Sequence, residues 1–189
     1  MSKTRTFIAI EAVDEVHSSA LKVIDRLQSA TDNVKWVAPD NLHWTMQFLG
    51  DLSDVEMAEV CLRTVRAAKR HEGFTIEARG VGAFPTIRHP RALWLGVGQG
   101  SEKFCELQAD VEASLESLGF RAERRQFVPH LTIGRVGAGS HGGSLLAERL
   151  EALADFNGGA MGVDAVTVYA SELSREGPTY HVLARAPLG

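Results

Sequence analysis

Short apolar runs along the chain alternate with stretches of helical periodicity. The run at residues 7–10 is aromatic and aliphatic, as in a buried strand, and apolar residues spaced three and four apart follow it over residues 16–27. A second run with strand character, residues 43–48, comes after that helical stretch. The first part of the chain is therefore predicted to form a strand, a helix and a second strand.

The same pattern recurs 87 residues later. Residues 43–46 (HWTM) and 130–133 (HLTI) both follow the pattern His-x-Thr-x, and 87 positions separate their histidines (43 to 130). Phe7 and Trp94, which open the preceding strand patterns, each lie 36 positions before their histidine (7 to 43 and 94 to 130). Helical spacing also recurs in the second copy, over residues 104–118. Self-similarity at a fixed offset predicts two related structural units.

Further elements follow each of the two His-x-Thr strands. Ser53 and Glu56 have the spacing of a helix capping box, and a buried helical stripe continues after them to Ala68. A weaker helix pattern covers residues 145–153, ahead of a predicted break at Gly158-Gly159. Three more strands are expected, at residues 74–81, 163–169 and 179–184.

These elements predict an α/β (α+β) fold of two pseudo-symmetric lobes. Each lobe is expected to hold an antiparallel-rich sheet with helices on its outer face, and the lobes are expected to enclose a central cleft. No long Pro, Gly or Ser run separates the halves. We therefore expect one bilobal domain over residues 1–189, with an internal repeat of roughly residues 1–90 and 91–189.

Composition narrows the class of protein. The 189 residues are 44% hydrophobic, which supports a packed core and argues against disorder. The net charge of −4 excludes a bulk positive field for nonspecific nucleic-acid binding, so any such contact is expected to be local. The apolar runs are too short for a membrane span or a signal-peptide core, and we expect a cytoplasmic protein without membrane contact.

The two His-x-Thr strands bring polar side chains to one surface. On an extended strand, alternate residues share a face, so His43 and Thr45 point together, as do His130 and Thr132. The intervening apolar residues are expected to pack under helices; they are Trp44, Met46 and Phe48 on the first strand, and Leu131 and Ile133 on the second. Two lobes built this way predict a groove in which two imidazoles face each other.

Such a groove suits acid–base chemistry at a phosphate. A neutral imidazole accepts a proton from an attacking hydroxyl or water, and a protonated one donates a proton to the departing oxygen. Histidine populates both forms near neutral pH because its ordinary pKa is about 6.5. The hydroxyls of Thr45 and Thr132 are placed to donate hydrogen bonds to the nonbridging phosphate oxygens.

At this point the residues resemble a known family. Residues 41–50 (NLHWTMQFLG) and 127–135 (FVPHLTIGR) are similar to the paired signature motifs of the two-histidine phosphoesterases. More narrowly, the chain resembles the bacterial and archaeal RNA 2′,3′-cyclic phosphodiesterases, historically called 2′-5′ RNA ligases. The fourth motif position, often Leu in that subfamily, is Met46 and Ile133 here. Matching patterns cover nearly the whole chain, at residues 5–10, 84–85, 90–96 and 171–180.

The resemblance implies hydrolysis of a terminal 2′,3′-cyclic phosphate of RNA to a 2′-phosphomonoester. It implies His43 as proton donor and His130 as proton acceptor, and it implies neither a metal nor a cofactor. Arg135 matches a phosphate-binding position. Strict alternation from His130 turns Arg135 away from the groove, so we expect a bulge or turn near Gly134 if it takes part.

Two alternative functions stay open at the level of sequence. The same groove is able to run the reverse chemistry, as a 2′-5′ RNA ligase, or to hold RNA ends without catalysis. The expected partner is RNA with a cyclic-phosphate end or a cyclic nucleotide, bound by a monomer. Arginines concentrated in residues 79–91 and 121–135 are candidates to guide a backbone. Candidates to stack a base are Phe7, Trp94 and Tyr180.

Overall fold

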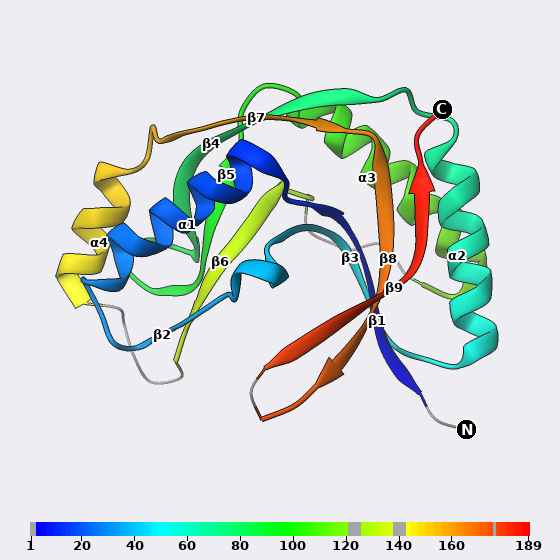
Figure 1. Ribbon diagram of the computed structural model, residues 1–189, viewed down its shortest axis with the longest axis horizontal. Coiled ribbons are helices and arrows are strands. Elements are labelled where there is room, and N and C mark those ends of the chain that lie inside the picture. Colours follow the sequence, from blue (N-terminus) through cyan, green and yellow to red (C-terminus); the bar gives the residue numbers. More distant parts are fainter. Residues whose placement is uncertain (1–2, 121–125, 138–142, 176) are drawn as a thin grey trace.

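A computed structural model describes residues 3–120, 126–137, 143–175 and 177–189 (Figure 1). The described part holds nine strands, four α-helices and two short 3-10 turns. In chain order these elements are β1 (Thr4–Glu11), α1 (Asp14–Gln28), β2 (Val34–Trp36), η1 (Pro39–Asn41), β3 (His43–Leu52), α2 (Asp54–Ala68), β4 (Phe74–Pro85), β5 (Pro90–Val97), α3 (Ser101–Leu115), η2 (Glu116–Leu118), β6 (His130–Val136), α4 (Gly143–Ala152), β7 (Asn157–Val163), β8 (Ala165–Leu173) and β9 (Pro178–Pro187).

The strands form a single antiparallel path that is weakest at its centre. Its order is β7-β4-β5-β6-β3-β1-β8-β9, and β2 pairs with the other part of β6. Across the described residues, β3 and β6 are joined through one pair of residues, Trp44 and Leu131. This seam divides the path into two antiparallel sheets, β7-β4-β5-β6 and β3-β1-β8-β9. The predicted α/β fold with antiparallel-rich sheets is confirmed.

The helices lie on the outer faces of the two sheets, as expected, but they cross between the sequence halves (Figure 1). Helix α1 packs on β7 and α4 packs on β4, whereas α2 packs on β8 and β9, and α3 contacts both β3 and β4. Helix α1 follows β1 in sequence and nevertheless covers the sheet that does not contain β1. Each spatial lobe therefore combines segments from both halves of the sequence.

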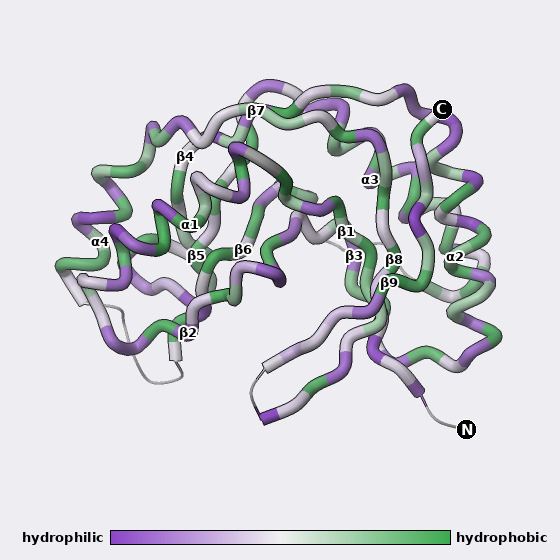
Figure 2. The backbone as a smooth tube through the Cα atoms, viewed as in Figure 1, coloured by the Kyte–Doolittle hydropathy of each residue, from purple (hydrophilic) through white to green (hydrophobic). Residues whose placement is uncertain are grey.

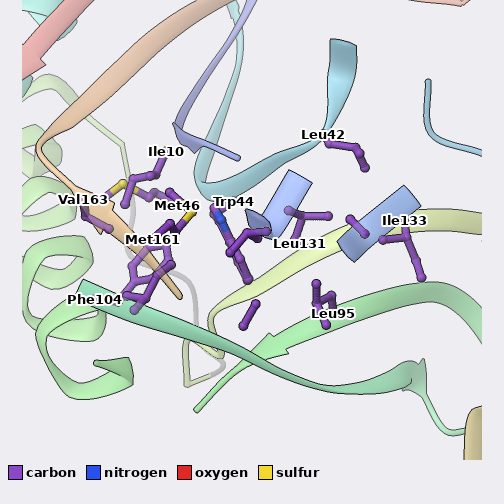
Figure 3. Close-up of a cluster of buried hydrophobic side chains, with 14 of the residues drawn as sticks. Ile10, Leu42, Trp44, Met46, Leu95, Phe104, Leu131, Ile133, Met161 and Val163 are labelled. Atoms are coloured by element: carbon purple, nitrogen blue, oxygen red, sulfur yellow. The ribbon is translucent and has the colours of Figure 1, made fainter. Parts of the chain in front are cut away.

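The apolar residues meet where the helices cover the convex faces of the sheets. Trp44, Phe104, Leu131 and Ile133 are fully buried and cluster at the seam (Figure 3). Figure 2 shows hydrophobic residues concentrated along the strands, with hydrophilic residues recurring along the outer helices. This core holds β3 and β6 side by side and leaves their opposite face free for polar groups.

Two expectations for the helices are confirmed in detail. Ser53 and Glu56 form the capping box at the start of α2, with the Ser53 backbone N–H donating to the Glu56 carboxylate at 2.8 Å. Helix α3 (Ser101–Leu115) begins and ends 87 residues after α1 (Asp14–Gln28), which is the offset of the sequence repeat. Among the described helices, none is both long and apolar enough to span a bilayer.

The predicted break at Gly158-Gly159 is wrong. Both glycines lie within β7, which pairs with β4. A Cβ at position 158 would lie 3.0 Å from the Cβ of Ala78, and Gly159 has φ +82°. These glycines permit a close approach of backbones inside a strand, a role that their composition alone does not distinguish from a loop. The strand expected at residues 163–169 is divided between the end of β7 and β8.

Candidate active site

The two His-x-Thr motifs lie on neighbouring strands at the seam. Because Trp44 pairs with Leu131 in an antiparallel ladder, the next residues on either side face one another: Thr45 lies across from His130, and His43 across from Thr132. Opposite residues have Cβ atoms about 4.5–5.5 Å apart and diagonal ones about 7–8 Å. The two histidines occupy a diagonal, and each faces the other's threonine.

Both imidazoles are held in the same tautomer by the backbone. Nδ1 of His43 lies 2.7 Å from the carbonyl oxygen of Asn41, and Nδ1 of His130 lies 2.7 Å from that of Val128. A carbonyl oxygen only accepts, so each Nδ1 carries the proton and donates it. Nε2 of each neutral ring is therefore left as an acceptor. This equivalence of partners, two residues upstream in both motifs, follows the internal repeat.

The surroundings of the two rings lower the pKa of both histidines. Burial is the largest cause for each, because it disfavours the charged imidazolium; the backbone hydrogen bond opposes it, and the charge of Arg135 lowers both values further. His43 lies against Phe7 and Tyr180, with ring centroids 4.9 and 5.3 Å away. The rings of His130 and Phe84 are perpendicular, with their centroids 5.0 Å apart.

Arg135 reaches the site because β6 is bulged. The partners on β5 shift register, with Leu93 opposite Gly134 but Trp94 opposite Thr132, which leaves Ile133 as the extra residue. The predicted irregularity near Gly134 is present. Arg135 is exposed and lines the same cavity as His130 and Thr132, although plain alternation from His130 would turn it away.

A matching bulge overturns the expectation for Phe48. Ile8 of β1 faces Gln47 but Ala9 faces Thr45, so β3 carries an extra residue at Met46. Trp44 and Met46 are buried under the helices as predicted, whereas Phe48 is 62% exposed and faces the polar side. Phe48 and Arg135 lie five positions after the two histidines, in equivalent places of the repeat.

Two cavities of about 480 Å³ each flank the seam. The first, which we call the phenylalanine cavity, is lined by Phe48, Phe84 and Phe127 together with Thr45, Thr132, His130 and Arg135. The second, the tyrosine cavity, is lined by His43, Tyr169 and Tyr180. His130 therefore lines the phenylalanine cavity and His43 the tyrosine cavity, and the strands that carry the two histidines pair at Trp44 and Leu131.

The structure places some of the other side chains that the sequence suggested for base stacking or RNA contact, and others lie outside the described residues. Phe7 is 2% exposed and stacks on Tyr169, which places it in the wall of the site. Tyr180 lines the tyrosine cavity, and Trp94 is partly buried against Phe84. Arg121, Arg124 and Arg125 lie outside the described residues. Over the described ranges, no group of three or more His, Cys, Asp or Glu residues is arranged to hold a metal ion.

Comparison with known proteins gives one family for most of the chain. A family model described as the 2'-5' RNA ligase superfamily matches residues 14–174. The chain is 36% identical over 178 residues to the RNA 2',3'-cyclic phosphodiesterase of Methanothermobacter thermautotrophicus, a match that covers 94% of this chain and 95% of that protein.

Solved structures agree with that match. TT0787 of Thermus thermophilus has a TM-score of 0.82 at 25% identity, over 97% of each chain. E. coli LigT complexed with 3'-AMP has a TM-score of 0.77 at 26% identity, over 98% of each chain. The similarity extends over both lobes and the seam between them.

Proposed function

Because the chain belongs to the 2′-5′ RNA ligase superfamily, we propose that it is a phosphodiesterase that opens the 2′,3′-cyclic phosphate at an RNA end to give a 2′-phosphomonoester. The observation that carries the proposal is the antiparallel pairing of the two His-x-Thr strands at Trp44 and Leu131. Extended by one residue in each direction, this register puts Thr45 across from His130 and His43 across from Thr132. Two relatives of this chain, from Methanothermobacter thermautotrophicus and Thermotoga maritima, are named RNA 2',3'-cyclic phosphodiesterase.

The reaction needs one proton removed and one supplied. In the proposed scheme, Nε2 of neutral His130 accepts a proton from a water molecule as its oxygen bonds to phosphorus. Protonated His43 donates its Nε2 proton to the departing 3′ oxygen, so the phosphate stays on the 2′ oxygen. Each such transfer typically contributes about 10² to 10⁴ in rate. The Nδ1 hydrogen bonds to Asn41 and Val128 leave the Nε2 atoms of both rings available for these two proton transfers.

The remaining side chains supply charge stabilisation. Thr45 and Thr132 donate hydrogen bonds to nonbridging oxygens, and the guanidinium of Arg135 binds the phosphate, whose negative charge redistributes during the displacement. The pKa values of both histidines, lowered by burial and by Arg135, rise again when an anionic phosphate occupies the site. Substrate binding thus favours protonation of the general acid.

We further propose that residues 1–189 act as one bilobal unit derived from a duplicated half, because both halves contribute one histidine strand to the seam. The proposed partner is RNA bearing a cyclic-phosphate end, and the proposed setting is a monomer in the cytoplasm.

The test uses an oligonucleotide with a defined 2′,3′-cyclic phosphate, incubated with wild-type protein, His43→Ala and His130→Ala in the presence of chelator. Wild-type protein is expected to yield the 2′-phosphomonoester, and each variant is expected to lose at least about 100-fold in kcat while still binding product. A 3′-phosphomonoester would reverse the leaving-group assignment. Joined strands after adding a 5′-hydroxyl oligonucleotide, without hydrolysis, would indicate a ligase. Absence of any turnover would indicate an end-binding protein.

A further inference from the structure

Two cations lie directly opposite each other on β2 and β6. Lys35 of β2 is the ladder partner of Arg135 of β6, and both residues are exposed. The neighbours of Lys35 in the strand, Val34 and Trp36, pack against the main core on the other face. Because opposite residues of an antiparallel pair share a face, Lys35 lies beside Arg135 on the polar face.

This pairing is unfavourable unless an anion neutralises the two charges. Like charges placed directly opposite each other destabilise a sheet. Among the residues that the structure describes, no ion pair joins Lys35 or Arg135 to an acid. The net charge of the chain is −4, so the pair does not follow from a general excess of positive charge. The two facing cations therefore indicate a site for an anionic ligand.

The cation pair continues the rows of catalytic side chains. A strand has two edges, and β5 occupies one edge of β6 along residues 130–135, so β3 and β2 follow each other along the other edge. With the register of β3 and β6 extended by one residue each way, the polar face carries three successive cross-strand pairs. Each histidine faces the threonine of the other motif, and Lys35 faces Arg135 beyond them. The third pair lies roughly 7 to 10 Å further along β6.

The two cations stand at different distances from the reacting groups. Arg135 lines the phenylalanine cavity with His130, whereas Lys35 lines neither that cavity nor the tyrosine cavity. The charge of Arg135 lowers the pKa of both histidines, and that of Lys35 makes no such contribution. Arg135 is thus the cation for the reacting phosphate, and Lys35 is available to a second anion. In RNA, the nearest second anion is the phosphodiester on the 5′ oxygen of the terminal nucleoside.

We infer that Lys35 binds the phosphodiester that joins the terminal nucleotide to its 5′ neighbour, while Arg135 binds the reacting phosphate. The inference rests on the proposed function and specifies its substrate: an oligonucleotide end is bound more tightly than a free nucleoside cyclic phosphate. The RNA then leaves the histidines along β6 toward β2. A contact to phosphate carries no sequence information, so this site accepts any sequence.

The experiment compares three substrates that share one cyclic-phosphate end. They are adenosine 2′,3′-cyclic phosphate, the dinucleotide ApA with a 2′,3′-cyclic phosphate, and the same dinucleotide with an uncharged methylphosphonate as its internal linkage. Wild-type protein is expected to have its lowest KM for the charged dinucleotide. Lys35→Gln is expected to raise that KM about 2- to 12-fold, the factor of one hydrogen bond, with kcat within about twofold. Its KM for the other two substrates is expected to equal the wild-type value.

Two further variants separate charge from a general disturbance of β2. Lys35→Arg keeps the charge and is expected to keep the low KM for the charged dinucleotide. Lys22→Gln, at an exposed lysine of α1, is the matched control and is expected to match wild-type protein. Removing one of two like charges is not expected to lower Tm, and circular dichroism and Tm establish that each variant is folded.

Ionic strength gives a readout that a purely structural role of Lys35 would not change. Each phosphate contact to a single strand contributes about −0.7 to the slope of log affinity against log salt concentration. In wild-type protein the slopes for the charged and the methylphosphonate dinucleotides are expected to differ by about that amount. The difference is expected to vanish in Lys35→Gln. An equal rise of KM for all three substrates, or a slope difference that persists in Lys35→Gln, would overturn the inference.

Binding without turnover distinguishes failure of this inference from failure of the proposed function. The probes are ApA 2′-monophosphate and its methylphosphonate analogue, and their Kd values are measured by calorimetry. If wild-type protein hydrolyses none of the substrates, the proposed hydrolase activity fails, while a loss of affinity in Lys35→Gln that is confined to the charged probe still supports the phosphodiester site. If the substrates are hydrolysed and Lys35→Gln binds the charged probe as wild-type protein does, the phosphodiester site alone is rejected.

Discussion

Asn41, the last residue of η1, is hydrogen-bonded to the ring of His43, the first residue of β3. The backbone carbonyl of Asn41 accepts the Nδ1 proton of His43 at 2.7 Å, and the side-chain Nδ2 of Asn41 donates to the carbonyl oxygen of Pro178 at 2.9 Å. The orientation of the His43 imidazole therefore depends on a contact between η1 and β9. No sequence motif connects Asn41 to Pro178.

Replacing Asn41 with Ala is expected to lower kcat about 2- to 10-fold and leave KM near the wild-type value. The carbonyl that holds His43 remains, but it loses its anchor on β9, and one hydrogen bond contributes about 0.5–1.5 kcal/mol. Steady-state kinetics with a cyclic-phosphate oligonucleotide measures the effect. Asn33→Ala, a change at an exposed asparagine in the preceding turn, is the control. A raised KM with normal kcat would contradict a positioning role.

The pH dependence of kcat/KM is expected to be bell-shaped, with its maximum below about pH 6.5. One histidine must be neutral and the other protonated, and burial and Arg135 lower the pKa of both. In Arg135→Gln the pKa of each histidine rises, so the maximum moves to higher pH while kcat/KM falls. Arg66→Gln, on α2, is the control and keeps the wild-type profile. A profile that is flat between about pH 5 and 9 contradicts the two-histidine scheme.

The bulge that presents Arg135 requires glycine at position 134. A Cβ there would lie 2.7 Å from Cγ1 of Val34 and 2.9 Å from Cε3 of Trp36, both on β2. Gly134→Ala is therefore expected to displace β2, to lower Tm by about 2–10 °C through overpacking, and to reduce kcat/KM. Gly162→Ala is the matched strand control, because no atom lies within 4 Å of its added Cβ. Tm is measured by calorimetry and kcat/KM by steady-state kinetics. Equal Tm and kcat/KM values for Gly134→Ala and Gly162→Ala would contradict the requirement for glycine at position 134.

Asp110 on α3 binds the turn that follows α2. It accepts hydrogen bonds from Arg70 at 2.7 and 3.0 Å and lies 2.9 Å from Nε2 of His71. Hydrogen bonding from Arg70 is the largest cause that lowers the pKa of Asp110, and His71 adds to it. A carboxyl whose pKa is lowered on folding stabilises the protein above its unfolded pKa of about 3.9, and this contribution is lost as pH falls through the lower folded value.

Asp110→Asn is accordingly expected to have a lower Tm than wild-type protein at pH 7, and the difference is expected to shrink below about pH 3. Thermal unfolding followed at several pH values measures it. Asp32→Asn, at an exposed position near β2, serves as the control. Activity at pH 7 stays at the wild-type level because Asp110 joins α2 to α3 on the outside of the sheet. A Tm difference that does not change with pH would argue against the charge effect.

Local sequence signals predicted the fold class and the histidine pair, because each depends on residues close together in the chain. The capping box at Ser53 fixes the start of α2 through its own side chain. The side of the sheet that Phe48 occupies was mispredicted for a different reason. An extra residue in β3 reverses the alternation beyond Met46, and a period of two gives no sign of it.

The sheet on which each helix packs could not be predicted from the local sequence pattern either. The stripe on α1 predicts that one face is buried, and Val16, Val23 and Leu27 are fully buried. The stripe does not say which sheet it meets, and α1 packs across the seam on β7. Contacts of this kind depend on the path of β4 and β7, which lie next to each other only in the folded chain.

Within the described residues, β3 and β6 pair only through Trp44 and Leu131, so the spacing of the two imidazoles depends on how the two sheets pack against each other. Along a continuous ladder, many hydrogen bonds would share the task of fixing that spacing. In this protein the spacing of the imidazoles depends on the packing of two large buried side chains, Trp44 and Leu131, on the opposite face of β3 and β6 (Figure 3). Replacing Trp44 or Leu131 with a smaller residue would therefore alter catalysis without removing any group that touches the phosphate.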